Sequence, residues 1–262
     1  MNVLTLVWRP LLVVVLALAL VPAVFAQSGT AKVRVIHASP DAPAVDVFVN
    51  GNRTLTNVPF FTASDYLDLA PGSYRLQIAP TGQPASAAVI DATATFQAGK
   101  AYSVAATGPV AQIKPTVIED NLSAPASGNA KVRVYHFSPD APAVDVKVAG
   151  GATLISNLPF PDASAYLEVP AGTYNLQVTP AGGSAVVIDL ANTTLEAGKI
   201  YSVFATNVVA QITPRVAVTT PVVAPGTLPA TSEGASMPLV VLAGAAVALI
   251  AMAALLRRRA AL

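Results

Sequence analysis

The chain has 262 residues, of which 53% are hydrophobic and 11% charged, and it contains two histidines and no cysteine. The lack of cysteine excludes disulfides, thiolate metal sites and cysteine nucleophiles, and two histidines exclude a three-histidine metal centre within one chain. Four of the fifteen basic residues flank two apolar runs near the ends, which leaves eleven bases against fourteen acids elsewhere. Without a basic patch, nucleic acid is not expected as a partner.

Residues 1–26 fit a secretory signal peptide. Arg9 provides a weakly positive start, residues 11–20 an apolar core, and Val24-Phe25-Ala26 a small-x-small cleavage site. An uncleaved N-terminal anchor is the alternative, and Pro22 together with the cleavage-type ending argues against it. The protein is therefore expected to be exported.

The strongest pattern in the chain is an internal repeat. Residues 32–47 (KVRVIHASPDAPAVDV) return as residues 131–146 (KVRVYHFSPDAPAVDV), and further matches keep an offset of 99 to 100. Solenoid repeats have periods of roughly 20–50 residues, so each copy is expected to be a domain with its own core. The predicted modules span residues 30–120 and 129–218, joined by a small, polar linker at 121–128.

Within each module the apolar residues alternate with a period of two. Val33, Val35 and His37 share one face, and the neighbouring charges take the other. Asn50-Gly51 indicates a tight hairpin, and Gly150-Gly151 does so in the second copy. The pattern predicts an all-β chain with about seven to nine short strands per module and no helix. We expect two tandem antiparallel β-sandwich domains of immunoglobulin-like or transthyretin-like form, with a small barrel as the alternative.

The repeated motif also indicates a family. His-x-Ser-Pro-Asp-Ala-Pro-x-Val-Asp-Val stands at His37–Val47 and His136–Val146 and resembles the signature of the DUF4397 family. The resemblance covers residues 30–120 and 129–218. It implies β-sandwich domains of exported bacterial proteins, often in tandem, and it implies no known activity.

The C-terminal part of the chain is typical of a surface anchor. Residues 219–236, rich in threonine, serine and proline, are expected to form a semi-extended stalk. Residues 237–256 contain no charge and are long enough for a helix that crosses about 30 Å of hydrocarbon. The basic tail at 257–262 then predicts a cytoplasmic C-terminus and an external N-terminus.

A short motif precedes the predicted span. Leu228-Pro229-Ala230-Thr231 resembles the sorting signal of Gram-positive cell-wall-anchored proteins, in which sortase cleaves after the threonine. The family pattern has glycine after the threonine, and this chain has Ser232. Two forms of attachment therefore remain open, a plain membrane anchor and a covalent link to the wall.

The two histidines lie in the repeated motif beside carboxylates, and these residues are the candidate ligand or bracing groups: His37, Asp41, Asp46, His136, Asp140 and Asp145. In one interpretation each module holds a small metal or ligand site. In the other, favoured because His37 falls on the apolar face, a buried imidazole bonded to a carboxylate or carbonyl braces the Ser-Pro-Asp-Ala-Pro bend.

Two further patterns have functional and structural interpretations. Ser39 and Ser138 follow a histidine by two positions, but a catalytic triad is defined by geometry, and Ser-Pro-Asp is typical of a turn. Aromatic residues could form a glycan-binding platform or pack within the sandwich; these are Phe60, Phe61, Tyr66, Phe160 and Tyr166.

These patterns favour a non-enzymatic surface protein without a cofactor, held at the extracellular face of the cell membrane by one C-terminal span. Its tandem modules would act as spacer, adhesive or envelope-structural units. A glycan- or metal-binding surface module is the alternative, and a secreted enzyme ranks third. The expected partners are the membrane and cell-wall or extracellular glycans or surface proteins.

Overall fold

The computed structural model describes residues 29–222. The predicted signal peptide, most of the stalk, the predicted span at 237–256, the motif residues Leu228, Pro229 and Thr231, and the tail at 257–262 lie outside the described residues. Among residues 29–222, no helix is long and apolar enough to cross a membrane.

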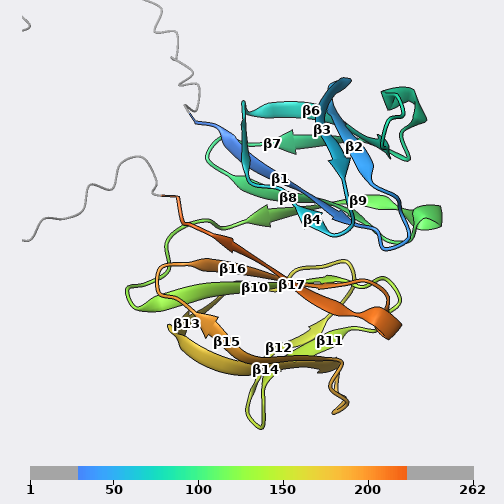
Figure 1. The fold of residues 1–262 in the computed structure, drawn as a ribbon. Coiled ribbons are helices and arrows are strands. Elements are labelled where there is room, and N and C mark those ends of the chain that lie inside the picture. The colour runs from blue at the N-terminus through green and yellow to red at the C-terminus, as the bar shows by residue number, and fades with distance from the viewer. Residues whose placement is uncertain (1–28, 223–262) are drawn as a thin grey trace, which may run out of the picture. The chain divides into compact units, whose positions relative to one another are not determined.

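The first module is built from nine strands in two sheets (Figure 1). The strands are β1 (Ala31–Ala38), β2 (Val45–Val49), β3 (Asn52–Val58), β4 (Thr62–Ala63), β5 (Leu67–Leu69), β6 (Gly72–Pro80), β7 (Ile90–Phe96), β8 (Ala101–Thr107) and β9 (Lys114–Asp120). One sheet has the order β4-β1-β8-β9, with β5 also paired to β1, and the other has the order β3-β2-β6-β7. Short 3-10 turns lie at η1 (Ala85–Ala87) and η2 (Val110–Gln112).

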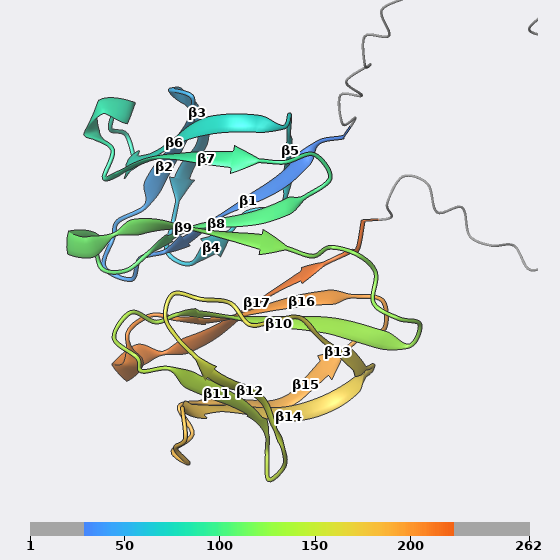
Figure 2. The same ribbon diagram turned by 180° about the vertical axis from the view of Figure 1, so that it is seen from behind.

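The second module repeats this arrangement with eight strands (Figure 2). The strands are β10 (Asn129–Phe137), β11 (Val144–Val148), β12 (Thr153–Leu158), β13 (Leu167–Pro170), β14 (Gly172–Pro180), β15 (Ile188–Leu195), β16 (Ile200–Thr206) and β17 (Thr213–Thr219), with the 3-10 turn η3 (Val209–Gln211) before β17. The sheets are β13-β10-β16-β17 and β12-β11-β14-β15. An isolated bridge between Tyr135 and Ala163 stands where the first module has β4.

The predicted all-β architecture and strand number are confirmed, but the prediction of purely antiparallel sheets is wrong. β1 runs parallel to β8, with Val33 opposite Tyr102, and β10 runs parallel to β16. Hairpin signals describe strands joined by tight turns, whereas six strands separate β1 from β8 along the chain. A parallel pair requires such a long connection, so turn signals do not reveal it.

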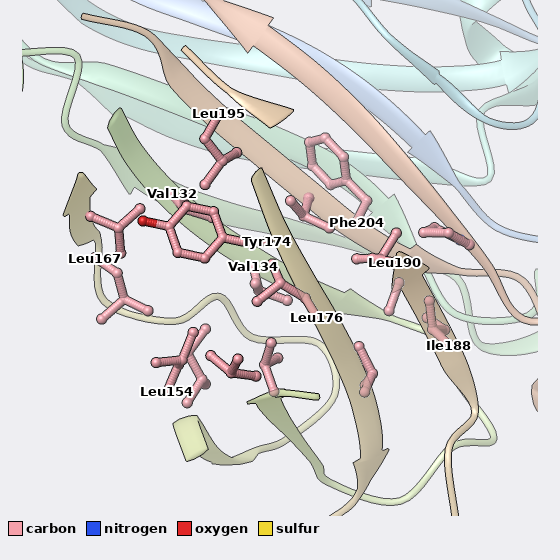
Figure 3. A pocket seen from close by; sticks show the side chains of 18 residues that line it. Val132, Val134, Leu154, Leu167, Tyr174, Leu176, Ile188, Leu190, Leu195 and Phe204 are labelled. Carbon is pink, nitrogen blue, oxygen red and sulfur yellow. The ribbon is translucent and has the colours of Figure 1, made fainter. Parts of the chain in front are cut away.

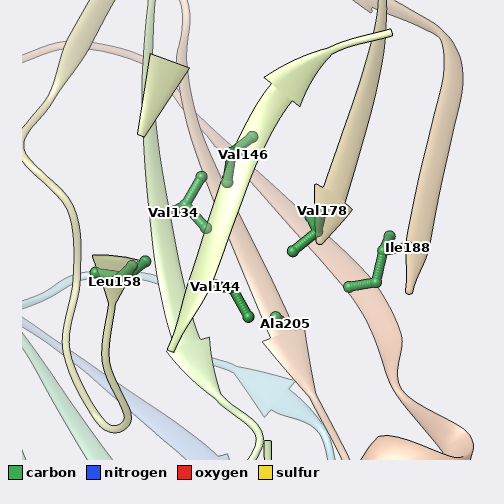
Figure 4. Packing of buried hydrophobic residues seen from close by; sticks show 7 residues of the cluster. All are labelled: Val134, Val144, Val146, Leu158, Val178, Ile188 and Ala205. Carbon is green, nitrogen blue, oxygen red and sulfur yellow. The ribbon is translucent and has the colours of Figure 1, made fainter. Parts of the chain in front are cut away.

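Each module has its own apolar core between its sheets. In the second module the buried cluster joins β10 and β16 of one sheet to β11, β12, β14 and β15 of the other (Figure 4). Its members are Val134, Val144, Val146, Leu158, Val178, Ile188 and Ala205. Aliphatic side chains each contribute about 1.5–3 kcal/mol when fully buried, so these clusters stabilise the packing of the two sheets against each other.

The hairpin predicted at Asn50-Gly51 is confirmed. Val49 lies opposite Asn52, which leaves a two-residue loop, and the φ angles of Asn50 and Gly51 are 50° and 80°. Both angles lie in the left-handed region that a type I′ turn needs. All strands of both modules find their sheet partners within residues 29–222.

Candidate functional site

The repeated motif forms the same bend in both modules, around a buried histidine. In the first module the Nε2 of His37 lies 3.0 Å from the carbonyl oxygen of Pro43, and the backbone N–H of Ser39 donates to Nδ1 over 3.4 Å. An Nδ1 that accepts places the ring proton on Nε2, which then donates to the carbonyl. The ring therefore links the end of β1 to the start of β2.

The second module reproduces this geometry. The Nε2 of His136 lies 2.9 Å from the carbonyl oxygen of Pro142, and the N–H of Ser138 donates to Nδ1 over 3.4 Å. Burial lowers the pKa of His37 and of His136, which favours the neutral imidazole that these bonds require. The arrangement is that of a brace, with backbone groups on both ring nitrogens.

Asp46 and its counterpart Asp145 bind backbone groups too. The carboxylate of Asp46 accepts from the N–H of Asn57 at 2.8 Å and from the N–H of Gly82 at 3.0 Å. These bonds, with a smaller contribution from Arg53, lower the pKa of Asp46. The second module repeats the contacts with Asp145, Asn157 and Gly182. Each carboxylate ties the end of β3 or β12, and the turn after β6 or β14, to the neighbouring strand.

Asp41 and Asp140 cap the 3-10 turns. The Oδ1 of Asp41 accepts from the N–H of Val110 at 2.8 Å, and that of Asp140 accepts from the N–H of Val209 at 2.8 Å. A carboxylate in this position satisfies an N–H group that lacks a partner at the start of a helical turn. Both aspartates are exposed. Within residues 29–222, no group of three or more histidine, cysteine, aspartate or glutamate side chains is arranged to hold a metal ion.

The Ser-Pro-Asp loops of both modules line one shared groove of about 390 Å³. Carboxylate and amide side chains line it together with prolines. Its lining residues are Pro40, Asp41, Pro109, Gln112, Pro139, Asp140, Asn207, Val208 and Gln211. The repeat thus places equivalent residues of the two copies around one polar groove, with acceptors and donors suited to hydroxyl groups.

The serine and aromatic candidates take packing positions. Ser39 and Ser138 are buried, and the Oγ of Ser138 has no hydrogen-bond partner. Phe60 packs edge-on against His37 at 6.1 Å between ring centroids, and Phe160 packs against His136 at 6.2 Å. The serines therefore stand beside the brace without the base-to-nucleophile hydrogen bond of a triad.

Sequence reasoning missed a polar cluster between the modules, which we call the junction cluster: Arg34, Tyr66, Ser103, Asp120, Arg133, Tyr135 and Ser202. Arg34 is 1% exposed although the alternation places it on the charged face. Its Nε donates to Ser103 of its own module at 2.7 Å. Its Nη2 donates to Tyr135 at 2.9 Å and to Ser202 at 3.0 Å, both in the second module.

Asp120, the last residue of β9, is the acceptor at the centre of the cluster. Its carboxylate accepts from Tyr66 at 2.8 Å, from Tyr135 at 2.5 Å, from Arg133 at 3.1 Å and from Ser103. The Nη2 of Arg34 lies 3.8 Å from it. Burial raises the pKa of Tyr66 and of Tyr135, so both phenols stay protonated and donate.

Around this cluster the two copies differ in size at equivalent positions. The first module presents Ile36, Ala38 and Ala105, and the second presents Tyr135, Phe137 and Phe204 in the same buried cluster. Large side chains of one copy therefore pack against small side chains of the other. By strand register, the counterpart of Asp120 in the second module is Thr219. The buried carboxylate of Asp120 therefore accepts hydrogen bonds from both modules, while the equivalent position of the second module holds no charge. These differences between the two copies were the sequence signal that could have indicated the junction between the modules.

The predicted linker takes part in the junction. Leu122 is 5% exposed and packs against Ala101 of the first module and Ile200 of the second. The Nζ of Lys131 donates to the carbonyl and to the hydroxyl of Ser123 at 2.8 and 2.9 Å. The segment therefore forms packed contacts with both modules, which its small polar composition did not indicate.

Comparison with known proteins gives the family. The model described as "Domain of unknown function (DUF4397)" matches residues 31–147 and 139–229. The chain belongs to the DUF4397 family. The first match begins at β1 and continues through the linker into β11, and the second begins in the Ser-Pro-Asp loop after β10. The junction therefore lies within the matched region of this DUF4397 protein.

Two solved structures show distant similarity to this DUF4397 chain. The Bacillus anthracis TIE protein is 10% identical over 68% of the chain, with a TM-score of 0.22, and the chain spans 34% of that protein's length. A proposed cell adhesion protein of Bacteroides fragilis is 8% identical over 75% of this chain and 100% of that one, with a TM-score of 0.18. No curated protein matches the chain.

Proposed function

We propose that this chain is a non-enzymatic exported surface protein whose two β modules act together as one rigid spacer or adhesive unit. The junction cluster is the observation that carries the proposal. The side chains of Arg34 and Asp120 are 2% and 0% exposed at the contact between the modules. Separating the modules would break a buried charged network. It would also expose the buried aromatic side chains of Tyr135, Phe137 and Phe204 to water, and this apolar burial favours the docked arrangement.

Rigidity distinguishes this function from that of flexibly linked binding modules. The packed linker residue Leu122 and the apolar contacts of Phe137 and Phe204 add to the polar network. Domains joined by small or polar interfaces usually move relative to one another. A stiff pair of modules instead keeps a fixed distance between its own two ends, which suits a spacer or an adhesive.

Spin labels attached to introduced cysteines can test the rigidity of the two-module unit, because the chain has no cysteine of its own that would also be labelled. Single cysteines at the exposed positions Asn52 and Thr153 would carry one label on each module of the full chain. We expect a narrow distance distribution that Asp120→Asn broadens and the surface variant Glu119→Gln leaves unchanged. A broad distribution in the unmodified protein would contradict the proposal.

We further propose the transthyretin-like alternative for the module fold. In an immunoglobulin constant-type domain, the first, second, fourth and fifth strands share a sheet. Here β1 and β2 lie in different sheets, as do β10 and β11. That separation argues against the immunoglobulin-like alternative.

The proposed location is the outer face of the cell membrane, reached through the signal peptide and kept by the C-terminal span. This part of the proposal rests on the sequence patterns at the two ends. Mass spectrometry of the mature C-terminus tests it. A product that retains Arg257–Arg259 indicates a membrane anchor, a product that ends at Thr231 indicates sortase attachment, and uncleaved cytoplasmic protein would contradict export.

Glycan binding is the second candidate function, and the shared groove favours it. Gln112 and Gln211 border the groove from equivalent positions and are exposed, so they offer amide groups to a hydroxyl-rich ligand. Cell-wall and extracellular glycans would be screened by thermal shift against the full chain. A glycan that binds here should lose its effect in the double variant Gln112→Ala, Gln211→Ala, while a fold defect would lower the melting temperature without any glycan.

A further inference from the structure

The second module contains a partly enclosed apolar cavity between its two sheets. The cavity has a volume of about 90 Å³ and a wholly apolar wall (Figure 3). The hydroxyl of Tyr174, the one polar side-chain group among its lining residues, donates to the carbonyl of Pro170 at 2.7 Å. An apolar wall offers water no hydrogen-bond partners, so such a cavity favours apolar molecules over water.

The first module fills the equivalent place with an aromatic ring. Phe96 lies opposite Gly72 and is 1% exposed, with its ring 5.9 Å from that of Tyr74 and 5.1 Å from that of Tyr102. In the second module the residue at this register, opposite Gly172, is Leu195, which lines the cavity. The second module therefore lacks the phenyl group that its sister copy holds there.

A backbone irregularity accompanies this difference. In the second module Thr193 lies opposite Tyr174 and Leu190 lies opposite Leu176, so β15 holds one more residue than β14 over this stretch. Asn192, with a φ of 54°, occupies the bulge, and its N–H donates to a side-chain oxygen at 2.8 Å. The first module pairs β6 with β7 without such a shift. β-bulges redirect neighbouring side chains. The bulge lies next to Leu190, which lines the cavity and is larger than its counterpart Ala92.

The rim of the cavity is apolar and reaches the surface. Leu154 lines the cavity and is 36% exposed, and by strand register its counterpart in the first module is Thr54. An exposed leucine at the edge of an apolar space offers a path for an apolar group from solvent. Nothing in the wall would compensate the desolvation of a charged or strongly polar ligand.

We propose that the second module binds one small uncharged apolar group, no larger than a single aromatic ring, between its sheets beside Leu154 and Leu195. The group is either a free aromatic or branched hydrocarbon or the apolar side chain of a peptide. This binding goes beyond the spacer or adhesive function, and it would distinguish the two copies of the repeat.

The test uses the full chain and begins by verifying that it unfolds cooperatively. Toluene and N-acetyl-phenylalaninamide serve as probes for the free and the peptide-borne group, with thermal shift and methyl NMR as readouts. We expect a saturable rise in melting temperature and shifts of the Leu195 and Val178 methyl signals. Leu195→Phe, which restores the residue of the first module, should weaken binding by at least about tenfold by filling the space.

Two more variants keep the test decisive. Val178→Ile, again taken from the first module, replaces Leu195→Phe if that variant fails to fold. Val218→Thr removes an exposed apolar residue outside the cavity and should leave probe binding unchanged. Absence of any saturable effect from both probes overturns the proposal, as does binding that persists in both cavity-filling variants. Response to one probe alone identifies whether a free or a peptide-borne group is accepted.

Discussion

Asp120→Asn is the most direct perturbation of the junction cluster. The substitution keeps the shape of the side chain but removes the carboxylate that lies close to both Arg34 and Arg133. In the unmodified protein, the hydroxyls of Tyr66 and Ser103 donate to the carboxylate. In the variant, the amide N–H groups would face these same donors. Since these side chains remain buried, we expect a loss of about 3–5 kcal/mol in the free energy of unfolding.

Glu119→Gln is the matched control for this prediction. Glu119 precedes Asp120 in β9 and pairs with Lys100 at 2.6 Å, but both side chains are about half exposed (53% and 47%). A surface pair contributes at most about 1 kcal/mol, so the control should stay close to the unmodified protein.

Urea unfolding followed by circular dichroism measures both variants. If the modules are uncoupled, Asp120→Asn should also separate one transition into two. A loss as small as that of Glu119→Gln, with a single unchanged transition, would refute the structural role of the junction cluster.

Three further outcomes are expected. The pKa of each motif histidine is lowered in the folded state, so the histidines stabilise the fold above about pH 6.5 and lose this effect as the pH falls through their folded pKa values. Urea unfolding from pH 7.5 to 5 should show a falling free energy of unfolding. The double variant His37→Gln, His136→Gln should reduce this dependence on pH. The pKa of Asp46 and of Asp145 is lowered in the folded state, so both carboxylates stabilise the fold above about pH 3.9 and lose this effect at lower pH. Acid titration of the variants Asp46→Asn and Asp145→Asn should show that this part of the acid dependence of stability is gone. Leu195→Phe should raise the free energy of unfolding by up to about 2 kcal/mol by filling a cavity of about 90 Å³, and destabilisation would instead indicate that the site cannot take the ring.

The candidate site was partly predictable because its residues act locally. His37 bonds to a carbonyl within its own bend, and Asp41 accepts from the turn that follows β8. Because the histidine acts locally, the short motif and its alternation were enough to indicate a buried, hydrogen-bonded imidazole. The interpretation of these residues as a brace agrees with the backbone bonds on both ring nitrogens. Metal binding, the other interpretation, stays untested.

The junction was not predictable in the same way because its partners are distant in the sequence. Arg34 and Ser202 are 168 positions apart, and the alternation of β1 indicates only that Arg34 lies opposite the module's own core. Whether that face meets water or protein depends on the second module. The differences between copies, such as Phe204 for Ala105 and Thr219 for Asp120, were visible, but only the docked structure explains them.

The amino-acid sequence by itself determined the all-β character and the hairpin at Asn50-Gly51, because period-two alternation and turn residues act over a few positions. It also determined the repeat and the family, because both are visible as matching residues. The tertiary structure decided the parallel pairing of β1 with β8, the cavity beside the β15 bulge and the burial of Arg34 against the second module. Each of these depends on which surfaces meet after the strands have formed. Strand patterns specify faces, and packing between distant segments specifies what those faces contact.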